Sequence, residues 1–404
     1  MEQTTAHHNV LFEAFKATAN VVATPWLSFT LATVGLLLML YFRRRVFNVW
    51  VGAALMVFLG LAIGIGARDP NFSLIVGKPD NVPITAMLFV STLVLWLAMA
   101  QAVNNDRRAE QKLPPDERET SQQKTWVWPD LLYIEFIALI ICSVVLVLWA
   151  IYLRAPLEQP ANPAATPNPS KAPWYFLGLQ EMLVYYDPWY AGVVLPSVIV
   201  LGLCAIPYID VNPKGNGYYT FAERKMSITL FLYGYLALWV FMIITGTFLR
   251  GPGWNFFGPF EYWDPHRVVA LNNVNLSDYV WIVWFQKLYR ITRIEWFNQG
   301  LPNVTNIVPQ LLPPGWNSIQ AFLIELGHAC KREFAGLLFL ALYFVALPGV
   351  LAKTVFKKFY QQMDFARYSV FVLLFLTMFT LPLKMVLRWT MNLKYFIDTP
   401  WIKF

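Results

Sequence analysis

The sequence is poor in the residues on which soluble enzymes and metal sites depend. Charged residues make up 14% of the 404 positions, against about a quarter in a soluble globular domain. There are three cysteines, Cys142, Cys204 and Cys330, and four histidines. No Cys-x-x-Cys-His segment occurs, and no four-cysteine spacing, so the chain encodes neither a c-type haem attachment nor a cysteine-bound iron–sulfur cluster. No metal site is predicted.

Hydrophobic residues are correspondingly abundant, at 57% of the chain, and 17 tryptophans suit anchoring at membrane–water interfaces. A helix that crosses the apolar core of a bilayer needs about 20 apolar residues. About eight stretches qualify: residues 25–42, 46–66, 83–103, 131–153, 189–208, 227–249, 334–352 and 368–391. Unpaired backbone groups are not tolerated in lipid, so these stretches must be helices. We therefore predict an all-α, polytopic transmembrane bundle of about eight spans.

Lysine and arginine collect in alternate short loops, which predicts the orientation of the spans. Basic residues occur at 43–45, 107–124, 214–225 and 353–358, and we expect all four loops on the cytoplasmic side. The net charge of +7 then reflects membrane topology and not nucleic-acid binding. Both termini and a long loop at 250–333 are expected outside. Residues 1–24 do not have the form of a cleavable signal, so the first span is expected to remain as an anchor.

Three motifs follow one another in the middle of the chain. Trp128-Pro129-Asp130-Leu131-Leu132 opens one apolar span, and residues 155–173 form a proline-rich loop that ends in Ala172-Pro173-Trp174-Tyr175-Phe176. The next span closes with Ile206-Pro207-Tyr208-Ile209-Asp210. In order and spacing, residues 125–250 resemble the C-terminal part of cytochrome b, or subunit IV of cytochrome bf complexes. Thr247–Trp254 looks like the bacterial, menaquinol-type members of that family.

The resemblance implies a subunit of a quinol:cytochrome c oxidoreductase that forms part of the outer quinol-oxidation site and couples electron transfer to proton translocation. Such a subunit is not catalytic alone. The implied partners are a cytochrome b N-terminal subunit that carries haem b, a Rieske iron–sulfur protein and cytochrome c subunits, in a dimeric complex surrounded by lipid. The implied location is a bacterial inner membrane, and no nucleic-acid partner is expected.

The proline-rich loop carries the predicted quinol-binding residues Pro173, Trp174, Tyr175 and Phe176. If a short surface helix covers 173–186, its three-and-four spacing places Trp174, Gly178, Glu181 and Tyr185 on one face. Quinol oxidation needs a flat apolar slot and a proton acceptor, and a buried carboxylate can take a proton.

The family's loop carries a glutamate in its Pro-Glu-Trp-Tyr motif, and Pro173 stands at that position here. We therefore predict Glu181 as the catalytic proton acceptor, with Tyr185 behind it. An ion pair with a lysine or arginine of the same loop is the alternative role for Glu181.

Asp130 stands at the cytoplasmic head of its span. An acid there is favoured by the helix dipole, so it could be a simple cap. By resemblance it lines the inner quinone site.

The four histidines, His7, His8, His266 and His328, do not provide the paired ligands on one helix that stacked haems require. This chain alone is therefore expected to hold no cofactor, and the haems are assigned to a partner.

Four ranges describe the predicted domains. Residues 1–124 form a three-span extension of unknown role, 125–250 the cytochrome b-like quinol-site domain, 251–333 the outer loop region and 334–404 two further spans. Within the outer loop, 279–297 is predicted as an amphipathic helix, either at the interface or against a partner. The alternative function is a non-catalytic membrane anchor of a respiratory complex. A secondary transporter is disfavoured because no inverted repeat is visible.

Overall fold

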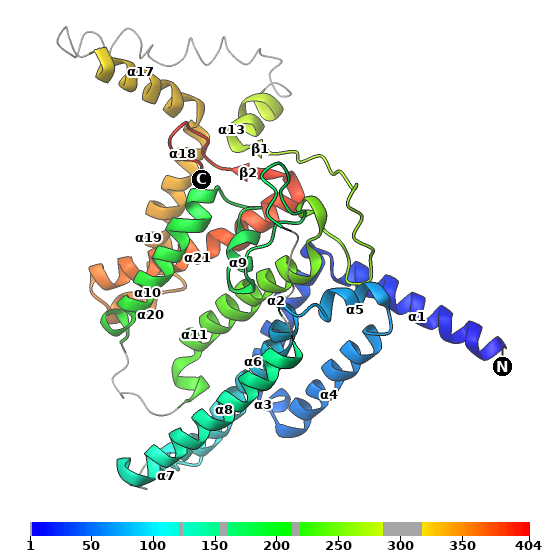
Figure 1. The fold of residues 1–404 in the computed structure, drawn as a ribbon. Helices are drawn as coiled ribbons and strands as arrows, with labels where there is room; N and C mark the ends of the chain where they lie inside the picture. The colour runs from blue at the N-terminus through cyan, green and yellow to red at the C-terminus, as the bar shows by residue number, and fades with distance from the viewer. Residues whose placement is uncertain (1, 121–123, 154, 156–159, 212–218, 286–316) are drawn as a thin grey trace. The chain divides into compact units, whose positions relative to one another are not determined.

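The computed structural model describes residues 2–120, 124–153, 155, 160–211, 219–285 and 317–404 (Figure 1). In these ranges the regular secondary structure is almost entirely helical, as predicted, and the only sheet pairs two short strands. The chain divides into two compact units. Unit 1 comprises residues 1–178 and 214–268, and unit 2 comprises 179–213 and 269–404. The division does not follow the four predicted domain ranges, which remain a prediction.

Seven helical segments in the described part of the chain are long and apolar enough to cross a membrane. They are Val49–Gly66, Val82–Glu110, Val127–Tyr152, Tyr190–Ile209, Phe221–Leu249, Phe334–Lys353 and Phe365–Met391. Val10–Val22 and Pro25–Tyr41, bent by 83° at the break between them, make an eighth if they count as one span. Each predicted span therefore coincides with a helix, and the polytopic all-α prediction is confirmed.

Some of these segments carry several helix labels because π-type turns interrupt them. In unit 1 the helices are α1 (Glu2–Val22), α2 (Pro25–Tyr41), α3 (Arg43–Val46), α4 (Val49–Gly66), α5 (Pro70–Val76), α6 (Val82–Glu110), α7 (Asp116–Thr120), η1 (Val127–Leu131), α8 (Leu132–Tyr152), α11 (Phe221–Leu232), η3 (Tyr233–Val240), α12 (Phe241–Ile244), η4 (Thr245–Leu249) and η5 (Pro252–Trp254). The short helix α9 (Trp174–Met182) begins in unit 1 and ends in unit 2.

The remaining elements belong to unit 2. They are η2 (Tyr190–Val194), α10 (Leu195–Ile209), β1 (Val274–Asn275), α13 (Leu276–Asp278), η6 (Tyr279–Phe285), α17 (Asn317–Arg332), α18 (Phe334–Ala341), η7 (Leu342–Ala346), α19 (Leu347–Lys353), α20 (Lys357–Gln362), α21 (Phe365–Met391) and β2 (Leu393–Tyr395). Strands β1 and β2 pair in parallel. Most of the predicted amphipathic segment 279–297 lies outside the described residues.

A shared apolar core joins the N-terminal extension to the cytochrome b-like region within unit 1. Leu36 and Leu40 of α2 and Trp96 of α6 pack in one cluster with Phe221 and Leu232 of α11. The extension is therefore built into the same packed unit as the segment around α11.

The basic loops of unit 1 meet at one end of that unit. Arg107 donates a hydrogen bond to the backbone oxygen of Arg44 at 2.8 Å, and the Arg43 guanidinium lies 4.5 Å from the ring centre of Phe221. Asn105 donates to the backbone oxygen of Tyr219 at 3.0 Å. The segments at 43–45, 105–107 and 219–221 thus share one end, as the charge pattern predicts for loops on one side of a membrane.

Unit 2 wraps the C-terminal segment around a buried lysine. The Lys384 side chain of α21 is 1% exposed, and its ammonium lies 4.4 Å from the ring centre of Tyr186, 4.8 Å from Phe404 and 5.3 Å from Phe396. Its Nζ atom has no hydrogen-bond partner among the described residues. Aromatic faces therefore supply the neighbours of this charge.

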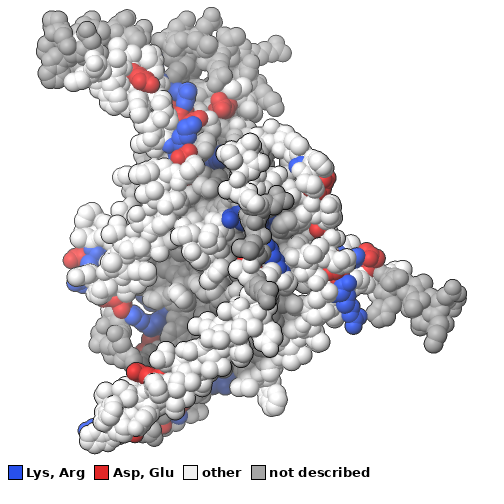
Figure 2. Space-filling model, viewed as in Figure 1, with Lys and Arg blue, Asp and Glu red and all other residues white. Residues whose placement is uncertain are grey.

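Helix α8 is the least covered span. None of its residues is buried in the described structure, and Figure 2 shows uncharged surface over most of its visible length. An apolar helix with every face open requires lipid or another chain around it.

Candidate functional site

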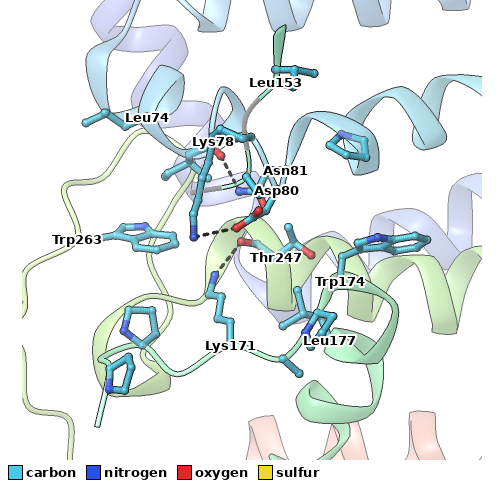
Figure 3. A pocket seen from close by; sticks show the side chains of 18 of the residues that line it. Leu74, Lys78, Asp80, Asn81, Leu153, Lys171, Trp174, Leu177, Thr247 and Trp263 are labelled. Atoms are coloured by element: carbon cyan, nitrogen blue, oxygen red, sulfur yellow. Dashed lines mark hydrogen bonds and ion pairs between the residues drawn. The ribbon is translucent and has the colours of Figure 1, made fainter. Parts of the chain in front are cut away.

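A cavity of about 900 Å³ opens within unit 1 beside the end of the proline-rich loop (Figure 3). A volume of this size is in the range that holds a small organic ligand. The walls come from α5, the turn before α6, the end of α8, the proline-rich loop, α9, η4 and the segment after η5. The cavity lies at the opposite end of α4 and α6 from the basic loops, because residues 71–83 contribute to its wall.

Lys171 fixes the lower wall of the cavity in Figure 3. Its ammonium donates a hydrogen bond of 2.8 Å to the backbone oxygen of Thr247 and lies 4.5 Å from the ring centre of Trp263. Asn168 of the same loop accepts a 2.7 Å hydrogen bond from the backbone N–H of Gly253. Gly253 has φ +66°, which glycine adopts without steric cost. The loop is thus tied to the end of the Phe221–Leu249 span at two points.

The apolar side of the cavity depends on close packing of α9. Trp174 and Leu177 line it. A Cβ atom added at Gly246 would lie 3.1 Å from the backbone oxygen of Leu177, so it would push the two segments apart by a few tenths of an ångström. A Cβ at Gly178 would meet Trp239 at 3.4 Å. Small residues therefore let α9 sit against η3 and η4 and present Trp174 to the cavity.

The polar side of the cavity contains a carboxylate–ammonium pair. Lys78 Nζ lies 3.3 Å from Asp80 Oδ2, and both residues line the cavity (Figure 3). Glu261 also lines it, but its carboxylate lies 3.7 Å from Arg267, which is not a lining residue. The cavity thus combines indole and aliphatic surface with charged groups.

Two polar atoms of the lining residues have no partner. The hydroxyl of Thr247 and the indole nitrogen of Trp263 are both buried, and neither has a hydrogen-bond partner among the residues described. Buried polar groups are normally satisfied. Two such unsatisfied atoms therefore belong to residues of one cavity wall.

The N-terminal helix braces two walls of the cavity. Lys16 of α1 lies 3.1 Å from Asp69, whose carboxylate also caps α5. The side-chain oxygen of Asn20 accepts a 3.0 Å hydrogen bond from the backbone N–H of Phe260, next to the lining residue Glu261. Burial alone would raise the pKa of Asp69, but hydrogen bonds from Lys16 and from the backbone of α5 hold that pKa below its usual value.

The structure separates the predicted site residues into two groups. Pro173 and Trp174 line the cavity, whereas Tyr175 and Phe176 are 51% and 50% exposed and do not. Glu181 and Tyr185 are buried residues of unit 2 and are not among the lining residues. The helix ends at Met182, so the predicted common face does not extend to Tyr185. The roles of Glu181 and Tyr185 stay predictions.

Asp130 is exposed in η1 at the head of α8, at the opposite end of that span from the cavity-lining residues Trp149 and Leu153. The described structure provides no further partner for it. Its assignment to an inner quinone site remains a prediction.

The described residues contain no group of three or more His, Cys, Asp or Glu side chains that could hold a metal ion. His266 and His328 are both exposed. The assignment of haem b to a partner subunit remains a prediction.

Sequence reasoning missed Lys78, Asp80, Thr247, Glu261 and Trp263. Lys78-Pro79-Asp80-Asn81 is a compact polar turn between two apolar segments, and this pattern signals an exposed loop. Nothing in the sequence indicates that this turn and the proline-rich loop line one cavity, because the two segments lie about 90 residues apart in the chain. Lys78 and Asp80 belong to the extension at residues 1–124, for which the sequence predicts no role.

Residues 160–249 match the family described as cytochrome b (C-terminal)/b6/petD. This region is a C-terminal cytochrome b domain, and it contains Lys171, Trp174, Leu177 and Thr247 of the cavity wall. The match supports a cytochrome b/b6-type membrane subunit of a bc- or b6f-type complex, with a general role in oxidation–reduction. No solved structure matches the chain.

Proposed function

We propose that the cavity beside Trp174 binds a quinol and contributes to its oxidation in a bc-type complex. The observation that carries the proposal is the position of the cavity. Its wall includes the end of the proline-rich loop of the C-terminal cytochrome b domain, where the family resemblance expects the outer quinol site. The cavity also lies at the end of unit 1 away from the basic loops, which the charge pattern assigns to the cytoplasm.

The chemistry of the walls supports the same ligand. A quinol has a flat apolar ring and two hydroxyl groups. Trp174, Leu177 and Pro173 offer a surface for the ring. Thr247 and Trp263, on the same wall, carry buried polar atoms that have no hydrogen-bond partner among the described residues, and small side-chain rotations would turn them toward the oxygens. The chain's own part is to bind and orient the quinol and to exclude water, while haem and iron–sulfur centres on partner subunits accept the electrons one at a time.

A pair of neighbouring aromatic residues provides the test. Trp174 lines the cavity, whereas Tyr175 is half exposed and does not. In the purified complex, Trp174→Ala is expected to weaken binding of a quinone analogue at least about tenfold, equivalent to about 1.4 kcal/mol. Tyr175→Ala is expected to leave it nearly unchanged. Equal behaviour of the two variants would count against a quinol site in this cavity.

The second candidate is a membrane anchor that keeps the fold without quinol chemistry. The observation in its favour is Pro173, which occupies the position of the family's loop glutamate. A complex that oxidises quinol with full activity while no variant of the cavity wall changes the rate would support this second function. In the same assay, loss of activity in Trp174→Ala would exclude it.

A further inference from the structure

We propose that Asp80, in the N-terminal extension, accepts the proton of the bound quinol hydroxyl. This inference rests on the proposed quinol function of the cavity. It assigns to the extension the carboxylate that is missing from the proline-rich loop.

The lining residues narrow the choice of carboxylate to two. Within the described structure, Asp80 and Glu261 are the acidic residues on the cavity wall, and Glu181 is not on it. Glu261 faces Arg267, whose guanidinium lies 4.9 Å from the ring centre of Phe257 and outside the lining. Asp80 instead faces Lys78, which lines the cavity with it. A ligand in the cavity can therefore contact both residues of the Asp80–Lys78 pair.

The Asp80–Lys78 pair is easy to open. The side chains are 53% and 49% exposed, respectively. An exposed ion pair of this kind contributes little to stability. Breaking it when Asp80 becomes neutral thus costs little compared with the benefit of positioned proton transfer, which is about 10²–10⁴-fold in rate. The same exposure gives the proton a route from Asp80 to solvent.

Removal of one electron from the quinol is accompanied by transfer of one proton. The O–H bond of the quinol hydroxyl breaks, its proton binds an Asp80 carboxylate oxygen, and one electron leaves to a one-electron iron centre on a partner subunit. Neutral Asp80 then releases the proton to water and pairs again with Lys78. Lys171 on the proline-rich loop and Glu261 after η5 are the other charged groups of the cavity wall.

The test compares three isosteric variants in the intact complex: Asp80→Asn, Glu261→Gln and Glu181→Gln. We expect Asp80→Asn to lower kcat roughly 100-fold, to leave the affinity for a quinone analogue nearly unchanged, and to abolish the acidic limb of the pH–rate profile. Glu261→Gln removes a carboxylate that is paired with Arg267 outside the lining, and it is expected to lower kcat far less than Asp80→Asn does. Asp80→Glu, which keeps the carboxylate, is expected to restore most of the activity, and that rescue separates lost chemistry from misfolding.

Failure of the Asp80 role and failure of the proposed quinol function of the cavity give different results. If the wild-type complex fails to bind the analogue, or Trp174→Ala binds it normally, the quinol function of the cavity is wrong. If binding and Trp174→Ala behave as expected but Asp80→Asn keeps the wild-type rate and profile, the role of Asp80 is wrong. In that second case, loss of the acidic limb in Glu181→Gln would identify Glu181 as the acceptor.

Discussion

Replacing Lys171 with methionine removes one charge from the cavity wall and keeps a side chain of similar length. The lysine ammonium donates a 2.8 Å hydrogen bond to the backbone oxygen of Thr247 and lies 4.5 Å from the ring centre of Trp263. A hydrogen bond from a charged donor contributes about 1.5–3 kcal/mol. A cation–π contact at a partly exposed site adds about 0.5–1 kcal/mol. Because the two share one ammonium and are not additive, we expect a combined loss of about 2 kcal/mol.

That loss should appear in ligand binding, because Lys171 holds the proline-rich loop against the wall where the ligand sits. A loss of about 2 kcal/mol corresponds to a dissociation constant raised roughly 30-fold. The assay is titration of the purified complex with a quinone analogue, followed by quenching of tryptophan fluorescence. Lys171→Arg keeps a cation that can reach both partners, and we expect its dissociation constant to stay within about threefold of wild type. If Lys171→Met binds as tightly as Lys171→Arg, then Lys171 does not organise the cavity.

Three further changes test other parts of the structure. Because the pKa of Asp69 lies below its usual value, the stabilisation that its carboxylate provides is present above about pH 4 and is lost as the pH falls through the lowered pKa. Asp69→Asn should remove this acid-dependent loss of stability, which thermal unfolding at pH 3 and pH 7 measures. An Asp69→Asn variant with the wild-type pH dependence would argue against the Lys16–Asp69 pair. Gly336→Ala makes a Cβ atom clash with the backbone oxygen of Phe396 and should destabilise unit 2 by about 1–3 kcal/mol. Gly349→Ala meets nothing within 4 Å and should be neutral or slightly stabilising in its helix. Equal unfolding temperatures of the two variants would refute the close contact at Gly336. Lys384→Met should raise the unfolding temperature, because a buried ammonium without a hydrogen-bond acceptor costs several kcal/mol, whereas methionine can still contact the aromatic rings around it. A lowered unfolding temperature would mean that the aromatic faces more than compensate for burying the charge.

The sequence predicted the spans well because the bilayer imposes a simple rule on length and polarity. Predicted span 83–103 corresponds to Val82–Glu110, and predicted span 189–208 to Tyr190–Ile209. The helix after the proline-rich loop was also expected, and it ends at Met182, earlier than the predicted 186. Chain reversal at 183–185 depends on tertiary packing, which periodicity does not encode.

The site was predictable only where it is local in sequence. Pro173 and Trp174 are adjacent to the motif that marks the loop, and both line the cavity. The three-and-four spacing correctly places Trp174 and Glu181 on a helix, but it cannot state which of them faces a cavity made by distant segments. Asp80 and Trp263 enter the wall from outside the region of family resemblance, so no motif could have pointed to them.

One wall of the cavity comes from the N-terminal extension and another from the C-terminal cytochrome b domain, and both are parts of a single polypeptide. The two walls are therefore translated in a fixed one-to-one ratio and inherited together. A substitution at Lys78 or Asp80 and one at Lys171 or Trp174 act on the same cavity, so selection on either segment is also selection on the other. Moving the domain into another complex without its extension would transfer only half of the cavity.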